Sequence, residues 1–127
     1  MLTIATMLRD IPRLEAPQAE LILRLFAARD DVDRLVSLVQ DVPRTAQYAR
    51  NLHSDPYSSR MWRRILVLHA ADVLLETAGV ESVEGTPYEY CNTGDSYATT
   101  LIYNSETDQL SLGSWADIIA ARESCSA

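Results

Sequence analysis

The first 78 residues have the spacing of apolar side chains that is typical of amphipathic helices. One helix is predicted after Pro17, because a single face collects apolar residues at positions i, i+1, i+4 and i+5: Leu21, Ile22, Leu25 and Phe26. A second helix is predicted at the carboxylates of Asp30, Asp31 and Asp33, which suit a helix N-terminus, and Pro43 ends it or opens the next. Its buried stripe is Val32, Leu35, Val36 and Val39. A third is predicted over residues 44–53, and a short apolar segment, Leu2–Leu8, precedes all of them.

The strongest helix prediction covers residues 58–78. Gly79 follows it, at the position where a left-handed residue commonly ends a helix. Its apolar residues fall on two faces, one with Trp62, Ile65, Leu66, His69 and Val73 and the other with Met61, Leu68 and Leu75. A helix that is apolar on two sides is usually the most buried one, so we expect this helix to form the centre of the core.

After Gly79 the pattern changes to the alternation with period two that is typical of strands. The alternating segments are 88–92, 96–103 and 109–115, and turn-forming residues at 92–95 and 104–108 separate them. We therefore predict an α+β fold in a single domain, residues 1–127. About four N-terminal helices pack against a C-terminal three-stranded antiparallel meander.

Charge divides the chain at the same place. All eleven basic residues are arginines, and the formal net charge is −7. Residues 1–78 hold ten acids and ten arginines, whereas residues 79–127 hold eight acids and only Arg122. An acidic region repels nucleic acid and favours basic partners, although acidic surfaces also serve solubility alone.

The location expected for this chain is the cytoplasm. Its apolar runs are too short for a membrane-spanning helix, and the first residues lack the basic region of a secretion signal. The two cysteines, Cys91 and Cys125, do not make a disulfide framework, which agrees with a reducing compartment.

Tyrosines are concentrated in the acidic part of the chain. Tyrosine gives a large contact area at low entropic cost and is common in binding hot spots, but strands also favour aromatic residues that pack inward. With the acids of the turns, these rings form the predicted partner-binding surface: Tyr88, Tyr90, Asp95, Tyr97, Tyr103, Glu106, Asp108 and Trp115. The basic cluster of Arg60, Arg63 and Arg64 is too small for a nucleic-acid footprint, and we expect it to pair with the chain's own acids or to form a rim contact.

The hypothesis that the chain is an enzyme depends on three residues. His69 with Asp72 one turn later resembles an oriented base, and Cys91 would be its thiolate nucleophile. The alternative is a locally bonded histidine at the edge of the core. The sequence has no phosphate-binding glycine loop and no zinc motif, so we expect no cofactor and no metal.

Residues 88–117, which begin Tyr-Glu-Tyr-Cys-Asn-Thr-Gly-Asp and end Gly-Ser-Trp-Ala-Asp, resemble the C-terminal segment of small uncharacterised proteins from bacterial plasmids and phages. In size and acidity the chain is also similar to phage-encoded inhibitors, including anti-CRISPR proteins and DNA mimics. The resemblance of residues 88–117 implies no activity. From the similarity in size and acidity and from the residues, the expected function is a non-enzymatic inhibitor that blocks a basic nucleic-acid-binding groove of a host defence complex. The alternatives are the cysteine enzyme and a structural homodimer that pairs through a sheet edge.

Overall fold

Helices form the N-terminal part of the chain and strands the C-terminal part, so the α+β class is confirmed. The computed structural model describes residues 2–53, 59–77, 84–86, 89–91 and 100–114. Within these residues it has five helices: α1 (Ile4–Asp10), α2 (Ala16–Ala27), α3 (Val32–Val39), α4 (Ala46–Ala49) and α5 (Arg60–Thr77). The strands are β1 (Glu84–Thr86), β2 (Glu89–Cys91), β3 (Thr100–Asn104) and β4 (Gln109–Gly113).

Short-range signals position the first helices. The apolar segment at the N-terminus forms α1, because Thr3 and Thr6 cap it reciprocally through their side chains and backbone N–H groups. Pro17 lies in the first turn of α2, as predicted, and the carboxylate of Asp31 caps α3 by accepting from the Arg34 N–H. The helix predicted over 44–53 is shorter than expected, since α4 covers four residues only.

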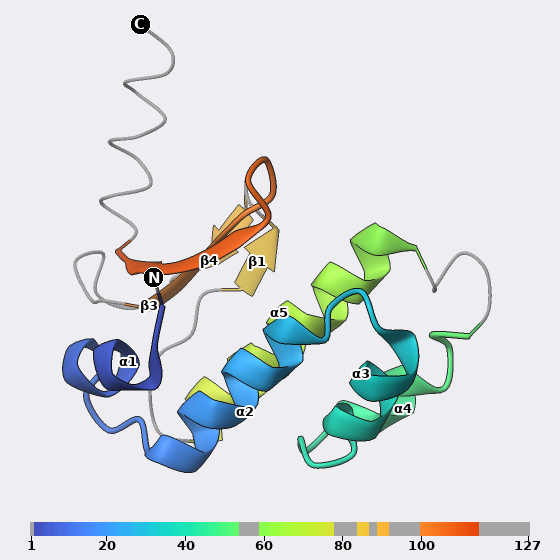
Figure 1. Ribbon diagram of the computed structural model, residues 1–127, viewed down its shortest axis with the longest axis horizontal. Coiled ribbons are helices and arrows are strands. Elements are labelled where there is room, and N and C mark those ends of the chain that lie inside the picture. Colours follow the sequence, from blue (N-terminus) through green and yellow to red (C-terminus); the bar gives the residue numbers. More distant parts are fainter. Residues whose placement is uncertain (1, 54–58, 78–83, 87–88, 92–99, 115–127) are drawn as a thin grey trace, which may run out of the picture.

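The core lies between α2 and α5, which run side by side in opposite directions (Figure 1). Ile22 and Leu25 of α2 are buried, as are most apolar residues of α5: Leu66, Val67, Ala70, Ala71, Val73, Leu74 and Leu75. The central position predicted for the long helix is thus confirmed. One of its expected inward residues is not inward, however, because Met61 is 62% exposed.

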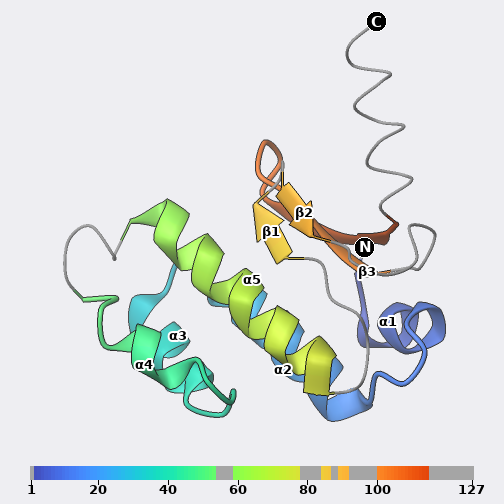
Figure 2. The same ribbon diagram turned by 180° about the vertical axis from the view of Figure 1, so that it is seen from behind.

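The strands lie on one side of the α2–α5 pair, while α1 lies near one end of the pair and α3 and α4 near the other. Figure 2 shows the same arrangement from behind. The buried cluster runs through these elements without a break, from Met7 in α1 to Leu101 in β3.

Strand pairing differs from the predicted meander. β3 pairs antiparallel with β4 in the register Asn104↔Gln109 to Thr100↔Gly113, which confirms the hairpin expected at 104–108. β2, however, pairs with β1, which lies outside the three strands predicted from the sequence. The described strands therefore make two two-stranded sheets, and a continuous three-stranded meander is not confirmed. Glu84, Gly85 and Thr86 show little alternation, which is why the strand pattern did not reveal β1.

Among the helices of the described residues, none has the length and the apolar run that crossing a bilayer requires.

Candidate functional site

The loop between β3 and β4 carries two of the predicted partner-binding residues. The Asn104 side-chain oxygen accepts hydrogen bonds from the N–H groups of Glu106, at 2.9 Å, and of Thr107, at 3.3 Å. This is the local bonding that makes asparagine a turn former. The loop ends at Asp108 with φ of 53°, a left-handed conformation that aspartate tolerates better than most residues. Its geometry thus follows from the side chains at its two ends.

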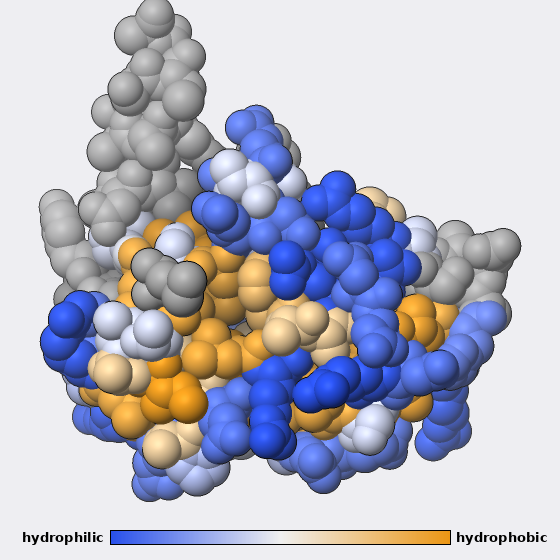
Figure 3. All heavy atoms as spheres, in the orientation of Figure 1, coloured by the Kyte–Doolittle hydropathy of each residue, from blue (hydrophilic) through white to orange (hydrophobic). Residues whose placement is uncertain are grey.

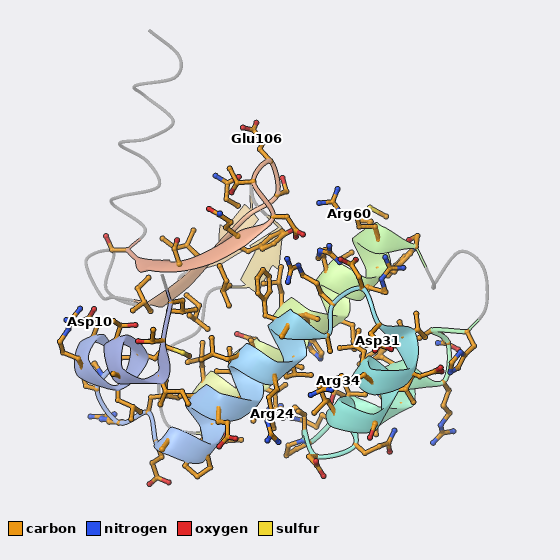
Figure 4. The ribbon with its side chains drawn as sticks, in the orientation of Figure 1. Asp10, Arg24, Asp31, Arg34, Arg60 and Glu106 are labelled. Carbon is orange, nitrogen blue, oxygen red and sulfur yellow. The ribbon has the colours of Figure 1, made fainter. Side chains whose placement is uncertain are left out.

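Glu106 and Asp108 have opposite environments although one residue separates them. Glu106 is exposed at the end of the hairpin (Figure 4). The side chain of Asp108 is 18% exposed and turns toward the helices. Both its oxygens accept from Arg64, with Nε–Oδ1 at 2.8 Å and Nη2–Oδ2 at 2.9 Å. The expectation that Asp108 lies on the surface, because it belongs to a turn, is wrong.

Further donors complete the surroundings of Asp108. Arg29 Nε donates to Oδ2 at 3.0 Å, and the Tyr103 hydroxyl donates to Oδ1 at 2.7 Å. Arg64 reaches past Asp108 to Asp30, with Nη1–Oδ1 at 2.9 Å, and Arg63 Nη2 donates to the same oxygen at 3.2 Å. We call this set the Arg64 cluster: Arg29, Asp30, Arg63, Arg64, Tyr103 and Asp108.

The Arg64 cluster joins three parts of the chain. Arg29 and Asp30 lie in the turn between α2 and α3, Arg63 and Arg64 in the first turns of α5, and Tyr103 and Asp108 on the hairpin. Arg63 Nε and Arg64 Nη1 also donate to the Arg29 carbonyl, at 2.9 and 3.1 Å. The guanidinium of Arg29 stacks on Phe26, 4.1 Å from the ring centre. The prediction that Arg63 and Arg64 pair with the chain's own acids is confirmed.

Ionisation in the cluster follows from these bonds. The hydrogen bonds from Arg64 hold the pKa of Asp108 far below its usual range, against the opposing effect of burial. The pKa of Asp30 is lowered for the same first reason. Burial by itself would lower the pKa of Arg64, but its bonds to Asp108 and Asp30 more than offset this and raise it. Burial, and then the bond to Asp108, raise the pKa of Tyr103, so its hydroxyl stays a donor.

Of the remaining residues predicted to form the partner-binding surface, Tyr103 and Tyr90 lie on strands that the structure describes. Tyr103 is 5% exposed, and its ring meets Phe26 edge-on at 6.1 Å, so it packs inward rather than facing a partner. Tyr90 is placed on β2 by its backbone alone. Four others lie outside the described residues: Tyr88, Asp95, Tyr97 and Trp115.

The proposed catalytic set is not assembled by the described contacts. His69 lines a pocket of about 400 Å³ between α4 and α5 with Trp62 and Tyr48, and the Tyr48 ring meets it edge-on at 5.4 Å. Asp72 makes no hydrogen bond to His69, and its Oδ1 is buried without a partner in the described part of the chain. Cys91 is the last residue of β2. No group of three potential metal ligands occurs among residues whose positions are described.

An apolar groove of about 630 Å³ separates β4 from α1 and α2. Figure 3 shows apolar side chains gathered on this face of the molecule. Leu23 and Phe26 of α2 form one wall, and Leu110 and Leu112 of β4 form the other. Consecutive residues from Asp108 to Leu112 line the groove, so it follows the strand along its length.

Sequence reasoning missed Arg29 and Asp30 as members of the cluster. The only local signal is their adjacency at a helix end, which is equally typical of a solvated turn. Comparison with protein-family models, with curated proteins and with solved structures finds no match to this chain.

Proposed function

We propose that the chain is a non-enzymatic binding protein whose acidic C-terminal part, residues 79–127, contacts a basic surface of a partner protein. The proposal rests on the difference in environment between Asp108 and Glu106 in the hairpin loop. Asp108 fixes the loop to the helical layer through Arg64, and Glu106 is exposed to solvent on the same loop. A recognition loop held rigidly loses less conformational entropy on binding than a flexible one.

The distribution of arginine charge supports an acidic rather than a basic binding face. Among the residues that the structure describes, six arginines lie within 3.2 Å of a carboxylate oxygen of the same chain: Arg9, Arg24, Arg29, Arg44, Arg63 and Arg64. Internal pairing reduces the attraction that these groups exert on phosphates. The excess of acids in residues 79–127 has no such compensation within its own segment, because Arg122 is the only arginine there.

The groove along β4 adds apolar area to the same half of the molecule. Protein interfaces combine an apolar centre with a polar rim. Leu110 and Leu112 line the groove, and so do the ion pairs Arg9–Asp10 and Arg29–Asp108. The most specific form of the proposal is that the chain is an inhibitor encoded by a mobile element. It would cover the nucleic-acid-binding groove of a host defence complex. Tyr88, Tyr90, Tyr97 and Trp115 remain proposed contacts, whereas Tyr103 and Asp108 are now assigned to holding the hairpin.

Capture from a lysate of the native host, followed by mass spectrometry, tests the proposal with matched baits. One bait carries Asp95→Asn and Glu106→Gln, and the control carries Glu15→Gln and Glu20→Gln, so each loses two negative charges. We expect the first pair to reduce capture of basic nucleic-acid-binding proteins and the second to leave it unchanged. Capture should also weaken as salt rises from about 50 to 500 mM. Equal capture by both baits at all salt concentrations would contradict the proposal.

A further inference from the structure

A further pocket lies between the first turns of α5 and the β3–β4 hairpin. Its volume is about 340 Å³. Met61, Ile65 and Leu68 form an apolar stripe along the helix, and Ser105 contributes a hydroxyl from the hairpin loop. Arg60 and Arg64 are its cationic residues. The pocket is at the small end of the range of ligand sites.

Arg60 differs from the other arginines around Asp108. Arg29 and Arg64 donate hydrogen bonds to this carboxylate, whereas Arg60 Nη2 lies 3.7 Å from Oδ2, beyond hydrogen-bonding distance. The Arg60 side chain is 61% exposed, and Figure 4 shows it projecting from the beginning of α5. Its donors therefore face solvent at the pocket.

The local balance of charge favours an anion beside Arg60. Asp108 faces the guanidinium groups of Arg29, Arg60 and Arg64, and Arg64 also binds Asp30. These five side chains carry three positive charges and two negative ones, so one positive charge is in excess. An incoming carboxylate would meet the fork of Arg60, which matches its geometry, without displacing the bonds between Arg64 and Asp108.

The apolar stripe defines the rest of the ligand. Met61 is 62% exposed, and Ile65 and Leu68 are partly buried, so all three have apolar surface to cover. From Met61 to Leu68 the helix rises roughly 10 Å, the length of an extended alkyl chain of about eight carbons. We propose that this pocket binds a medium-chain fatty carboxylate, with the head group on Arg60 and the chain along Met61, Ile65 and Leu68.

Titration of the full, isotope-labelled chain with octanoate, followed by NMR, tests this assignment. We expect saturable shifts of the Ile65, Leu68 and Ser105 amides with a Kd of roughly 1 mM, as for a small ligand of this size. Octan-1-ol, which lacks the charge, and acetate, which lacks the chain, should each bind at least tenfold more weakly. No partner protein is present, so the outcome is independent of the function proposed above.

Matched variants separate the head-group contact from the chain contact. Arg60→Gln should weaken octanoate binding about tenfold, the effect of losing one charge-assisted hydrogen bond, while Arg24→Gln on the exposed face of α2 should leave it unchanged. Met61→Gln should weaken octanoate and leave acetate unaffected. The proposal is overturned by an absence of saturable shifts up to about 20 mM octanoate, by equal binding to Arg60→Gln and the parent chain, or by tighter binding of an N-acetylated peptide that ends in leucine.

Discussion

The two ends of α5 are held in the fold by different forces. Its first turns are fixed by directional bonds, because Arg63 and Arg64 donate to the Arg29 carbonyl and to Asp30 and Asp108. Its later turns, through Val73 and Leu74, are fixed by burial of apolar side chains against the neighbouring elements. Apolar burial supplies most of the stabilising free energy, but it is not directional.

The directional bonds at the beginning of α5 explain how the β3–β4 hairpin is held in a defined position. A guanidinium that binds a carboxylate through two nitrogens sets both the distance and the angle of its partner. Arg64 is 6% exposed, so its bonds are shielded from competing water. The ion pairs elsewhere on the surface lack this shielding: in Arg44–Glu76, for example, both side chains are at least 60% exposed. Such exposed pairs contribute little to stability.

The largest expected loss of stability comes from removing Arg64, whose hydrogen bonds hold the first turns of α5. Arg64→Met keeps an unbranched apolar stem but removes the guanidinium, which leaves Asp108 and Asp30 without their main donor. Removing one partner of a buried ion pair usually costs about 3–5 kcal/mol in the free energy of unfolding. Urea unfolding measures this loss, and Arg24→Met, which removes an exposed arginine, is the control. Equal urea midpoints for the two variants would show that the cluster is not a stabilising element.

The buried apolar side chains of α5 should be slightly less sensitive than Arg64. Leu66→Ala or Val73→Ala removes buried methyl groups and should lower the free energy of unfolding by about 2–4 kcal/mol. Glu20→Ala, at an exposed position of α2, should change it by less than about 0.5 kcal/mol. Coincident thermal melting curves for the three variants would contradict the position of the core.

The Tyr103 hydroxyl offers a narrower test, because Tyr103→Phe removes one hydrogen bond to Asp108 and keeps the ring packed on Phe26. Loss of a hydrogen bond to a charged group should cost about 1.5–3 kcal/mol. If the bond holds the hairpin, hydrogen exchange of the β3 and β4 amides should accelerate more than that of the α2 amides. Uniform acceleration across the chain would indicate a general loss of stability instead.

Acid should gradually reduce the contribution of the Arg64 cluster to the free energy of unfolding. The pKa values of Asp108 and Asp30 are lower in the folded chain than in the unfolded chain, so their contribution to stability is complete above the ordinary carboxyl pKa of about 4. It is lost as the pH falls below that value, toward the folded pKa values. We expect Asp108→Asn to flatten the decline in unfolding free energy between about pH 4 and pH 2, measured by urea unfolding. The parent and the variant declining in parallel would exclude Asp108 as the titrating group.

Local sequence determined most of the helices and one of the two hairpins. Periodicity and end signals predicted α2, α3, α5 and the 104–108 connection, because these depend on residues only a few positions apart. The length of α4 and the strand β1 were not predicted. A short helix and a three-residue strand carry too few positions for a period to show, and β1 depends on its pairing with β2.

For the candidate site, the sequence identified the residue types and only the tertiary structure decided their roles. Glu106 and Asp108 are equivalent by local pattern, since both are acids in a hairpin loop. What separates them is the position of Arg64, 44 residues away in the chain, whose guanidinium lies within hydrogen-bonding distance of Asp108. Contacts at such separation depend on how α5 packs beneath the hairpin, and the packing is a property of the whole core that no local pattern contains.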